Sequence, residues 1–97
     1  MHHKGGSMNR YAIIVDGRVQ GVGFRYRVVV LATDHHLTGW VRNLSNGMVE
    51  LEVQGEETDL AAFLSGLRKN DRFIRIDDYS VKSIQPHSGE TGFHVRY

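Results

Sequence analysis

The sequence contains no cysteine and only one proline, Pro86. Without cysteine, the chain has neither a disulfide framework nor a thiolate for catalysis. Long hydrophobic segments are missing as well. No apolar run is longer than that of Val28–Ala32, which is far shorter than the roughly 20 residues that a membrane-spanning helix needs. No secretory signal is visible. We therefore expect no membrane partner and a cytoplasmic location, with which the absence of cysteine agrees.

The chain also lacks a strong excess of either charge, since its formal net charge is +1 at pH 7. Residues 1–7 contain one lysine and no acid. They resemble a leader added during cloning, with Met8 as an alternative start, so we expect a single domain over residues 8–97. That domain has no formal net charge, whereas proteins that bind nucleic acids nonspecifically are usually basic. We expect no nucleic-acid partner, but a local anion site remains compatible with this composition.

Short β-branched or alternating segments predict five strands. They cover Tyr11–Val15, which Asp16 and Gly17 should end, then Leu37–Asn43, Met48–Gln54, Tyr79–Ile84 and Phe93–Tyr97. Asn46 and Gly47 favour a tight turn and thus a hairpin between the second and third strands. The third strand alternates most clearly. Its alternation places Glu50 and Glu52 on a solvent-exposed face, where both are expected to be ionised, so we do not interpret them as an acid–base pair.

Helical periodicity predicts two helices. The first covers Phe24–His35, with Phe24, Val28 and Ala32 on one face, although consecutive valines lower its helix propensity. The second covers Glu56–Lys69, where apolar residues recur at helical spacing and acidic and basic residues favour its two ends. Asn70 is expected to end this helix in the left-handed conformation, and residues 70–75 are expected to form a loop.

The resulting order, βαββαβ with a short terminal strand, predicts an α+β protein of the ferredoxin-like, split β-α-β class. Both helices should cover one face of an antiparallel sheet. The first two strands are joined by a helix and should run parallel. With the third strand between them, they would lie about 10 Å apart, twice the strand spacing. The loop after the first strand would then face Asn43 across a gap that fits a phosphate and one water.

That loop has the composition of an anion-binding nest. It reads Gln20-Gly21-Val22-Gly23-Phe24-Arg25. Glycines allow backbone N–H groups to converge, and a helix N-terminus adds further donors and a positive dipole. The guanidinium of Arg25 matches phosphate oxygens. The alternative is a flexible turn followed by a solvated arginine. The loop lacks Gly-Lys-Ser/Thr and the complete dinucleotide fingerprint, which excludes both classes of nucleotide site.

Asn43 has two interpretations as well. Asparagine at the end of a strand is most often a turn residue. Opposite an anion-binding loop, however, its amide could hold a water molecule by both donating and accepting hydrogen bonds.

At these residues the sequence resembles the acylphosphatase family. Gly17-Arg18-Val19-Gln20-Gly21-Val22-Gly23-Phe24-Arg25 resembles the first signature of that family. The second signature resembles Gly39-Trp40-Val41-Arg42-Asn43 followed by Asn46-Gly47-x-Val49-Glu50, and the segment Gly92-Phe93-x-Val95-Arg96-Tyr97 is similar too. The resemblance covers residues 9–97. Two departures stand out: His36 replaces the glycine expected after the first helix, and Asn46 replaces the more usual aspartate.

The resemblance implies hydrolysis of acyl phosphates, with Arg25 and the backbone of residues 20–25 binding the phosphate and Asn43 positioning the attacking water. We expect inorganic phosphate to be product and inhibitor, and we expect a monomer that needs neither metal nor cofactor. His36 is expected to take the left-handed conformation of the glycine that it replaces.

Other interpretations are weaker. His35 and His36 could form a metal pair, but adjacent residues on a helix diverge and no acid is spaced to help. Trp40, Tyr11 and Phe93 could form a base-stacking platform, as in RNA binders of similar fold, although core packing is favoured. Two rival functions remain open at this point: a noncatalytic module that senses a small anion, and a nucleic-acid binder.

Overall fold

The computed structural model describes residues 8–97, so the expectation about residues 1–7 lies outside the described residues. The elements in chain order are β1 (Met8–Arg18), α1 (Phe24–Asp34), β2 (Thr38–Asn43), β3 (Val49–Glu56), α2 (Glu57–Leu67), β4 (Arg75–Ile84) and β5 (Phe93–Val95). This is the predicted α+β, ferredoxin-like order with a short final strand. Within residues 8–97, no helix is long and apolar enough to cross a lipid bilayer.

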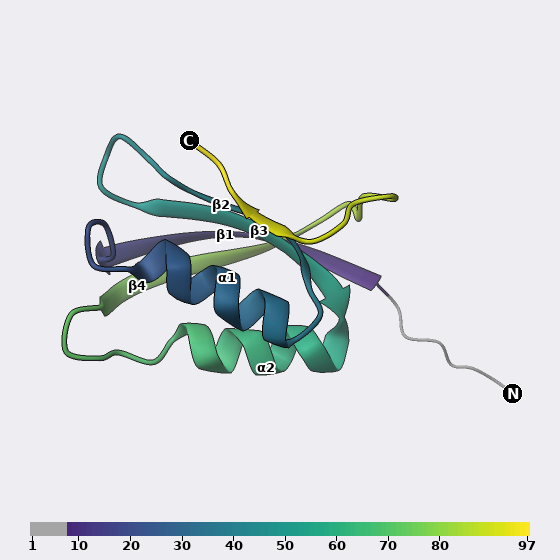
Figure 1. Ribbon diagram of the computed structural model, residues 1–97, viewed down its shortest axis with the longest axis horizontal. Coiled ribbons are helices and arrows are strands. Elements are labelled where there is room, and N and C mark those ends of the chain that lie inside the picture. The colour runs from purple at the N-terminus through teal and green to yellow at the C-terminus, as the bar shows by residue number, and fades with distance from the viewer. Residues whose placement is uncertain (1–7) are drawn as a thin grey trace, which may run out of the picture.

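The strands form one sheet in the order β4-β1-β3-β2-β5. Since β1 and β2 both pair antiparallel with β3, they run parallel to each other with β3 between them, as predicted. β5 pairs parallel with β2. The sheet is therefore mixed, and the expectation of a purely antiparallel sheet is wrong at this edge. Both helices cover the same face of the sheet (Figure 1).

The core lies between this face and the two helices. Alternate side chains of the three central strands point into it, where they meet one face of each helix. The most buried members are Ile13, Val15, Val19, Phe24, Val28, Ala32, Val41, Val49, Leu51, Val53, Leu60, Phe63 and Leu67. Complete burial of an aliphatic or aromatic side chain contributes about 1.5–3 kcal/mol, so this cluster fixes the register of the central strands.

Strand pairing shifts two predicted boundaries. Asp16 and Gly17 do not end β1, because they pair with Asp78 and Ile76 of β4 across an irregularity in the register. β4 accordingly begins at Arg75, within the segment expected to be a loop. Hydrogen bonding between neighbouring strands therefore overrides the turn preference of Asp-Gly.

The ends of the two helices test two predicted conformations. His36 has φ 59°, as predicted. Asn70 is not left-handed, since His36 is the one non-glycine residue with positive φ in the described range. The end of α2 is instead held by Arg27 of α1, whose guanidinium donates to the carbonyls of Gly66, Leu67 and Lys69.

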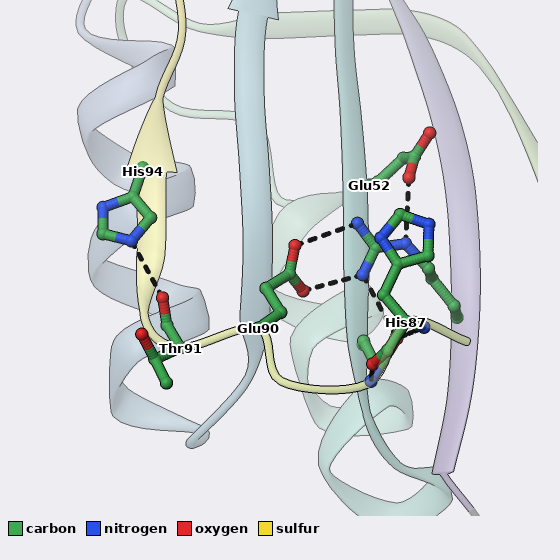
Figure 2. A network of polar contacts seen from close by, with 7 residues as sticks. Glu52, His87, Glu90, Thr91 and His94 are labelled. Atoms are coloured by element: carbon green, nitrogen blue, oxygen red, sulfur yellow. Dashed lines mark hydrogen bonds and ion pairs between the residues drawn. The ribbon is translucent and has the colours of Figure 1, made fainter.

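The face opposite the helices is not simply solvated. The segment 85–92 contacts it (Figure 2). The side-chain amide of Gln54 and the backbone of His87 exchange hydrogen bonds of 2.8 Å in both directions. Arg10, with an exposed fraction of 0%, forms ion pairs with Glu90 at 2.7 Å and Glu52 at 2.9 Å. The prediction that Glu52 is a solvated residue is therefore wrong, because it is a partner of a buried arginine.

Candidate active site

The predicted loop and Asn43 lie at the same edge of the sheet. Residues 19–23 connect the end of β1 to the start of α1, and Asn43 is the last residue of β2. Because β1 and β2 are parallel, their C-terminal ends meet at one edge. Figure 1 shows the loop and the β2–β3 hairpin on this side of the molecule.

The loop has the conformation of a nest of backbone donors. Gly21 and Gly23 have φ of 73° and 83°, values that only glycine adopts without strain. Within the described chain, no backbone N–H group from Gln20 to Tyr26 donates a hydrogen bond to another residue. A series of unpaired backbone N–H groups before a helix is a typical binding site for an anion.

The start of α1 carries no negative charge to satisfy these donors. Gly23 at the N-cap provides no side-chain hydrogen bond, and the first turn contains no acid. In contrast, the first turn of α2 contains Glu57 and Asp59. The positive end of the α1 dipole is therefore left uncompensated, which favours an external anion.

Arg25 adds a full positive charge at this helix start. It is half-buried, and no carboxylate of residues 8–97 lies within ion-pair distance of it. Its guanidinium carbon lies 5.5 Å from the centroid of the Tyr97 ring. A hollow of about 260 Å³ beside it is lined by Val19, Gly21, Gly23, Phe24, Arg25, Tyr26, Val95 and Tyr97. The arrangement can bind a phosphate-sized anion with a small group attached.

The other loop residues contribute mainly through their backbone. Phe24 is buried, and Val22 packs partly against the core. The side chain of Gln20 turns to the hairpin instead, where its Nε2 donates to the carbonyls of Leu44 and Met48. These three side chains are therefore not directed to an anion in the nest, whereas their N–H groups remain available.

Asn43 has an unusual side-chain oxygen. The residue is half-buried, but its Oδ1 is fully buried and accepts no hydrogen bond from residues 8–97. An unsatisfied buried acceptor costs about 1–3 kcal/mol, and no donor of residues 8–97 satisfies this one. Asn43 does not line the hollow beside Arg25. The side chain of Gln20 links the phosphate loop to the hairpin that follows Asn43 by hydrogen bonds.

The structure also bears on the two other sites considered from the sequence, the base-stacking platform and the metal pair. Tyr11 and Phe93 pack on the helix-covered face. Trp40 belongs to the other face, where Arg96 and Arg42 lie over its ring at 4.6 and 5.5 Å. The three aromatic residues therefore form no common stacking platform. His35 is half-buried and His36 exposed, and within residues 8–97 no cluster of three metal-ligating side chains is present.

Comparison with known proteins links these features to one family. A family model described as Acylphosphatase matches residues 11–95. The acylphosphatase of Clostridium beijerinckii is 44% identical over 90 residues, which cover 93% of this chain and 100% of that protein. The acylphosphatase of Bacillus licheniformis is 46% identical with the same coverage. The crystal structure of acylphosphatase from Bacillus subtilis matches with a TM-score of 0.86 and 40% identity, over 92% of this chain and 99% of that one.

Proposed function

The chain belongs to the acylphosphatase family and is an enzyme that hydrolyses acyl phosphates, and on this basis we propose that Arg25 and the backbone of residues 20–25 bind the phosphate while Asn43 positions the attacking water. The observation that carries this assignment is the uncompensated positive charge around Arg25. The nest, the helix start and the guanidinium all favour an anion, and no carboxylate of the described chain neutralises them.

The chemistry asks little of the protein beyond binding and alignment. The water oxygen forms a bond to phosphorus while the bond between phosphorus and the acyl oxygen breaks, which releases a carboxylate and inorganic phosphate. A carboxylate is a good leaving group and needs little help from an acid. The enzyme must neutralise charge on the phosphoryl oxygens and orient the water. Neither Arg25 nor Asn43 is a general base, so the substrate phosphate takes the proton of the water.

Asn43 suits the orienting role because it is neutral. The side-chain amide can donate to the water oxygen and accept from the water, and no donor of residues 8–97 competes for its Oδ1. A carboxylate at the same place would repel the phosphate. Direct attack by water forms no phosphoenzyme.

The proposal extends to the conditions of the reaction. We propose that the enzyme acts in the cytoplasm as a monomer without metal or cofactor, and that inorganic phosphate inhibits it competitively by occupying the nest. The alternative is a noncatalytic module that senses a small anion. It would bind phosphate in the same nest but would not turn over substrate.

Hydrolysis of benzoyl phosphate, followed by absorbance, tests this function. We expect turnover that a chelator does not reduce and that inorganic phosphate inhibits competitively. Loss of activity on chelation, restored by one metal, would contradict the metal-free mechanism. Phosphate binding without any turnover would favour the sensing module.

A further inference from the structure

Gln20 is the residue that joins the phosphate loop to the segment of Asn43. Its Nε2 donates to the carbonyl of Leu44 at 2.7 Å and to that of Met48 at 2.8 Å. Leu44 directly follows Asn43, and its own N–H donates to Met48 at 2.8 Å. A single amide nitrogen therefore holds both sides of the β2–β3 hairpin at the point where Asn43 ends β2.

The chemistry of the two partners fixes the orientation of this amide. Both are backbone carbonyls, which only accept hydrogen bonds, so the NH₂ end of Gln20 must face them. Both hydrogens of Nε2 are then used, and this nitrogen has none to offer a phosphate. The side chain of Gln20 is consequently not a ligand of the anion, although its backbone belongs to the nest.

Strand pairing places Asn43 but does not reach the phosphate loop. Val49 of β3 pairs with Val15 of β1 on one side and with Asn43 of β2 on the other. β1 and β2 are separated by β3, so the loop after β1 and the end of β2 are not paired with each other. Within residues 8–97, no other hydrogen bond links residues 19–23 to the hairpin residues 44–48. Beyond the strand pairing, Gln20 is therefore the one hydrogen-bonded tie between the loop and the hairpin in this part of the chain.

We propose that Gln20 is a positioning residue, which holds Asn43 at the distance from the nest that aligns its water with the bound phosphate. The inference rests on the proposed function of Asn43. Misplacement of a reacting group by about 1 Å can cost on the order of 100-fold in rate, so loss of this link should affect turnover far more than phosphate binding.

The variant Gln20→Met tests the proposal, because methionine has a similar length but no donor. We expect kcat to fall about 10- to 100-fold, while the Kd for inorganic phosphate, measured by calorimetry, changes by less than about 3-fold because the backbone donors of the nest remain. Gln85→Met is the matched control, since Gln85 is exposed in the segment after β4. Circular dichroism sets a temperature at which every variant is folded.

A double-mutant cycle between Gln20 and Asn43 distinguishes a positioning role of Gln20 from a merely structural one. In an Asn43→Ala background, Gln20→Met should lower the remaining turnover by less than about 3-fold, because residues that act through one another are not additive. Additive losses would overturn the proposal, as would parallel losses of kcat and phosphate affinity in Gln20→Met. If Gln20→Met does not fold, Gln20→Leu serves the same cycle, since its side chain is neutral and cannot donate to the two carbonyls.

A spectroscopic measurement provides a readout that does not depend on activity. The side-chain amide signal of Asn43 in a ¹⁵N NMR spectrum should shift in Gln20→Met and stay in place in Gln85→Met. An unchanged signal, or wild-type kcat in Gln20→Met while Asn43→Ala is inactive, would overturn the role of Gln20 alone. Wild-type kcat in Asn43→Ala would instead contradict the proposed function itself.

Discussion

Arg25 and Arg27 show how the partners of a single residue decide its role. Both lie in the first turns of α1. Arg27 donates to three carbonyls at the end of α2, and Asp71 lies 3.9 Å from its guanidinium. Arg25 has no comparable partner in the described chain. Arg27 therefore stabilises the packing of one helix against the other, and Arg25 is the arginine that remains for a ligand.

Replacement of Arg25 should impair binding and turnover together. We expect Arg25→Ala to lower kcat/KM at least about 100-fold, the usual cost of losing a donor to a developing charge, and to weaken phosphate binding as well. Arg25→Lys should rescue poorly, because an ammonium lacks the planar fork. Arg72→Ala, which removes an exposed arginine, is the control. Wild-type phosphate affinity in Arg25→Ala would remove Arg25 from the site.

His36 offers a test of backbone strain. A residue with a Cβ at φ 59° costs on the order of 1 kcal/mol. His36→Gly relieves this cost, although the added freedom of glycine in the unfolded chain offsets part of the gain. We expect a slightly higher midpoint of urea denaturation and unchanged kcat. A clear drop in the midpoint would show that the imidazole makes a contact worth more than the strain.

The sequence indicates some residue roles better than others. The left-handed position of His36 was predictable, because it replaces a glycine at a helix end. The side-chain role of Gln20 was not, because its partners are backbone carbonyls, which every residue carries. The role of Asn70 could not be predicted either, because its partner is also a backbone group. Its Oδ1 accepts a hydrogen bond from the N–H of Ile76, and the residue does not end α2 in the left-handed conformation.

At the scale of elements, the alternation of residues along the strands could not predict that the segment 85–92 lies against the sheet. Period-two alternation in β3 indicates which residues share a face, but not what covers that face. His87 of this segment binds Gln54, and Glu90 shares the guanidinium of Arg10 with Glu52. Both residues of the segment are more than 30 positions away along the chain from the β3 residue concerned. The limits of β1 and β4 depended in the same way on their mutual pairing, whereas the helices, whose periodicity is local, were found within a few residues.

The ion pair between Glu90 of this segment and Arg10 of β1 should make the free energy of unfolding depend on pH in the acid range. A hydrogen bond from Arg10 is the main cause that lowers the pKa of Glu90 below its ordinary value of 4.5. A depressed folded-state pKa contributes stability above the unfolded value, and this stability is lost as the pH falls through the lower folded-state value. We therefore expect the free energy of unfolding to decline below about pH 4.5.

Glu90→Gln should weaken this acid dependence. At pH 7 we expect a loss on the order of 2 kcal/mol, typical of a hydrogen bond to a charged group, with kcat nearly unchanged because Arg10 lies at the opposite end of β1 from the phosphate loop. Gln85→Ala controls for substitution within the same segment. Urea denaturation between pH 3 and 7 (a range set about the ordinary carboxyl pKa) provides the measurement. Identical pH profiles for wild type and Glu90→Gln would exclude the ion pair as the cause.

At the scale of the whole molecule, the topology creates the proposed site. β1 and β2 run parallel because α1 connects them, and β3 keeps them one strand apart. The phosphate loop and Asn43 thus come to the same edge from separate segments. This placement could be predicted from the order of elements alone. The hydrogen bonds by which Gln20 ties the loop to the hairpin could not be predicted in this way.

Separate segments make the central claim testable with a single substitution. If Asn43 holds the water and not the phosphate, then Asn43→Ala leaves the nest of residues 20–25 intact. Turnover should nevertheless fall by orders of magnitude, because loss of one orienting group at a preorganised site costs about 3 kcal/mol or more. Asn43→Asp should fail too, because its charge repels the phosphate.

The decisive measurement is therefore kcat for benzoyl phosphate in Asn43→Ala, together with the calorimetric Kd for inorganic phosphate and the melting curve. The account predicts a kcat at least about 100-fold lower, with a Kd and a melting curve close to those of the wild type. A wild-type kcat would contradict it, since Asn43 would then be only the turn residue at the end of β2.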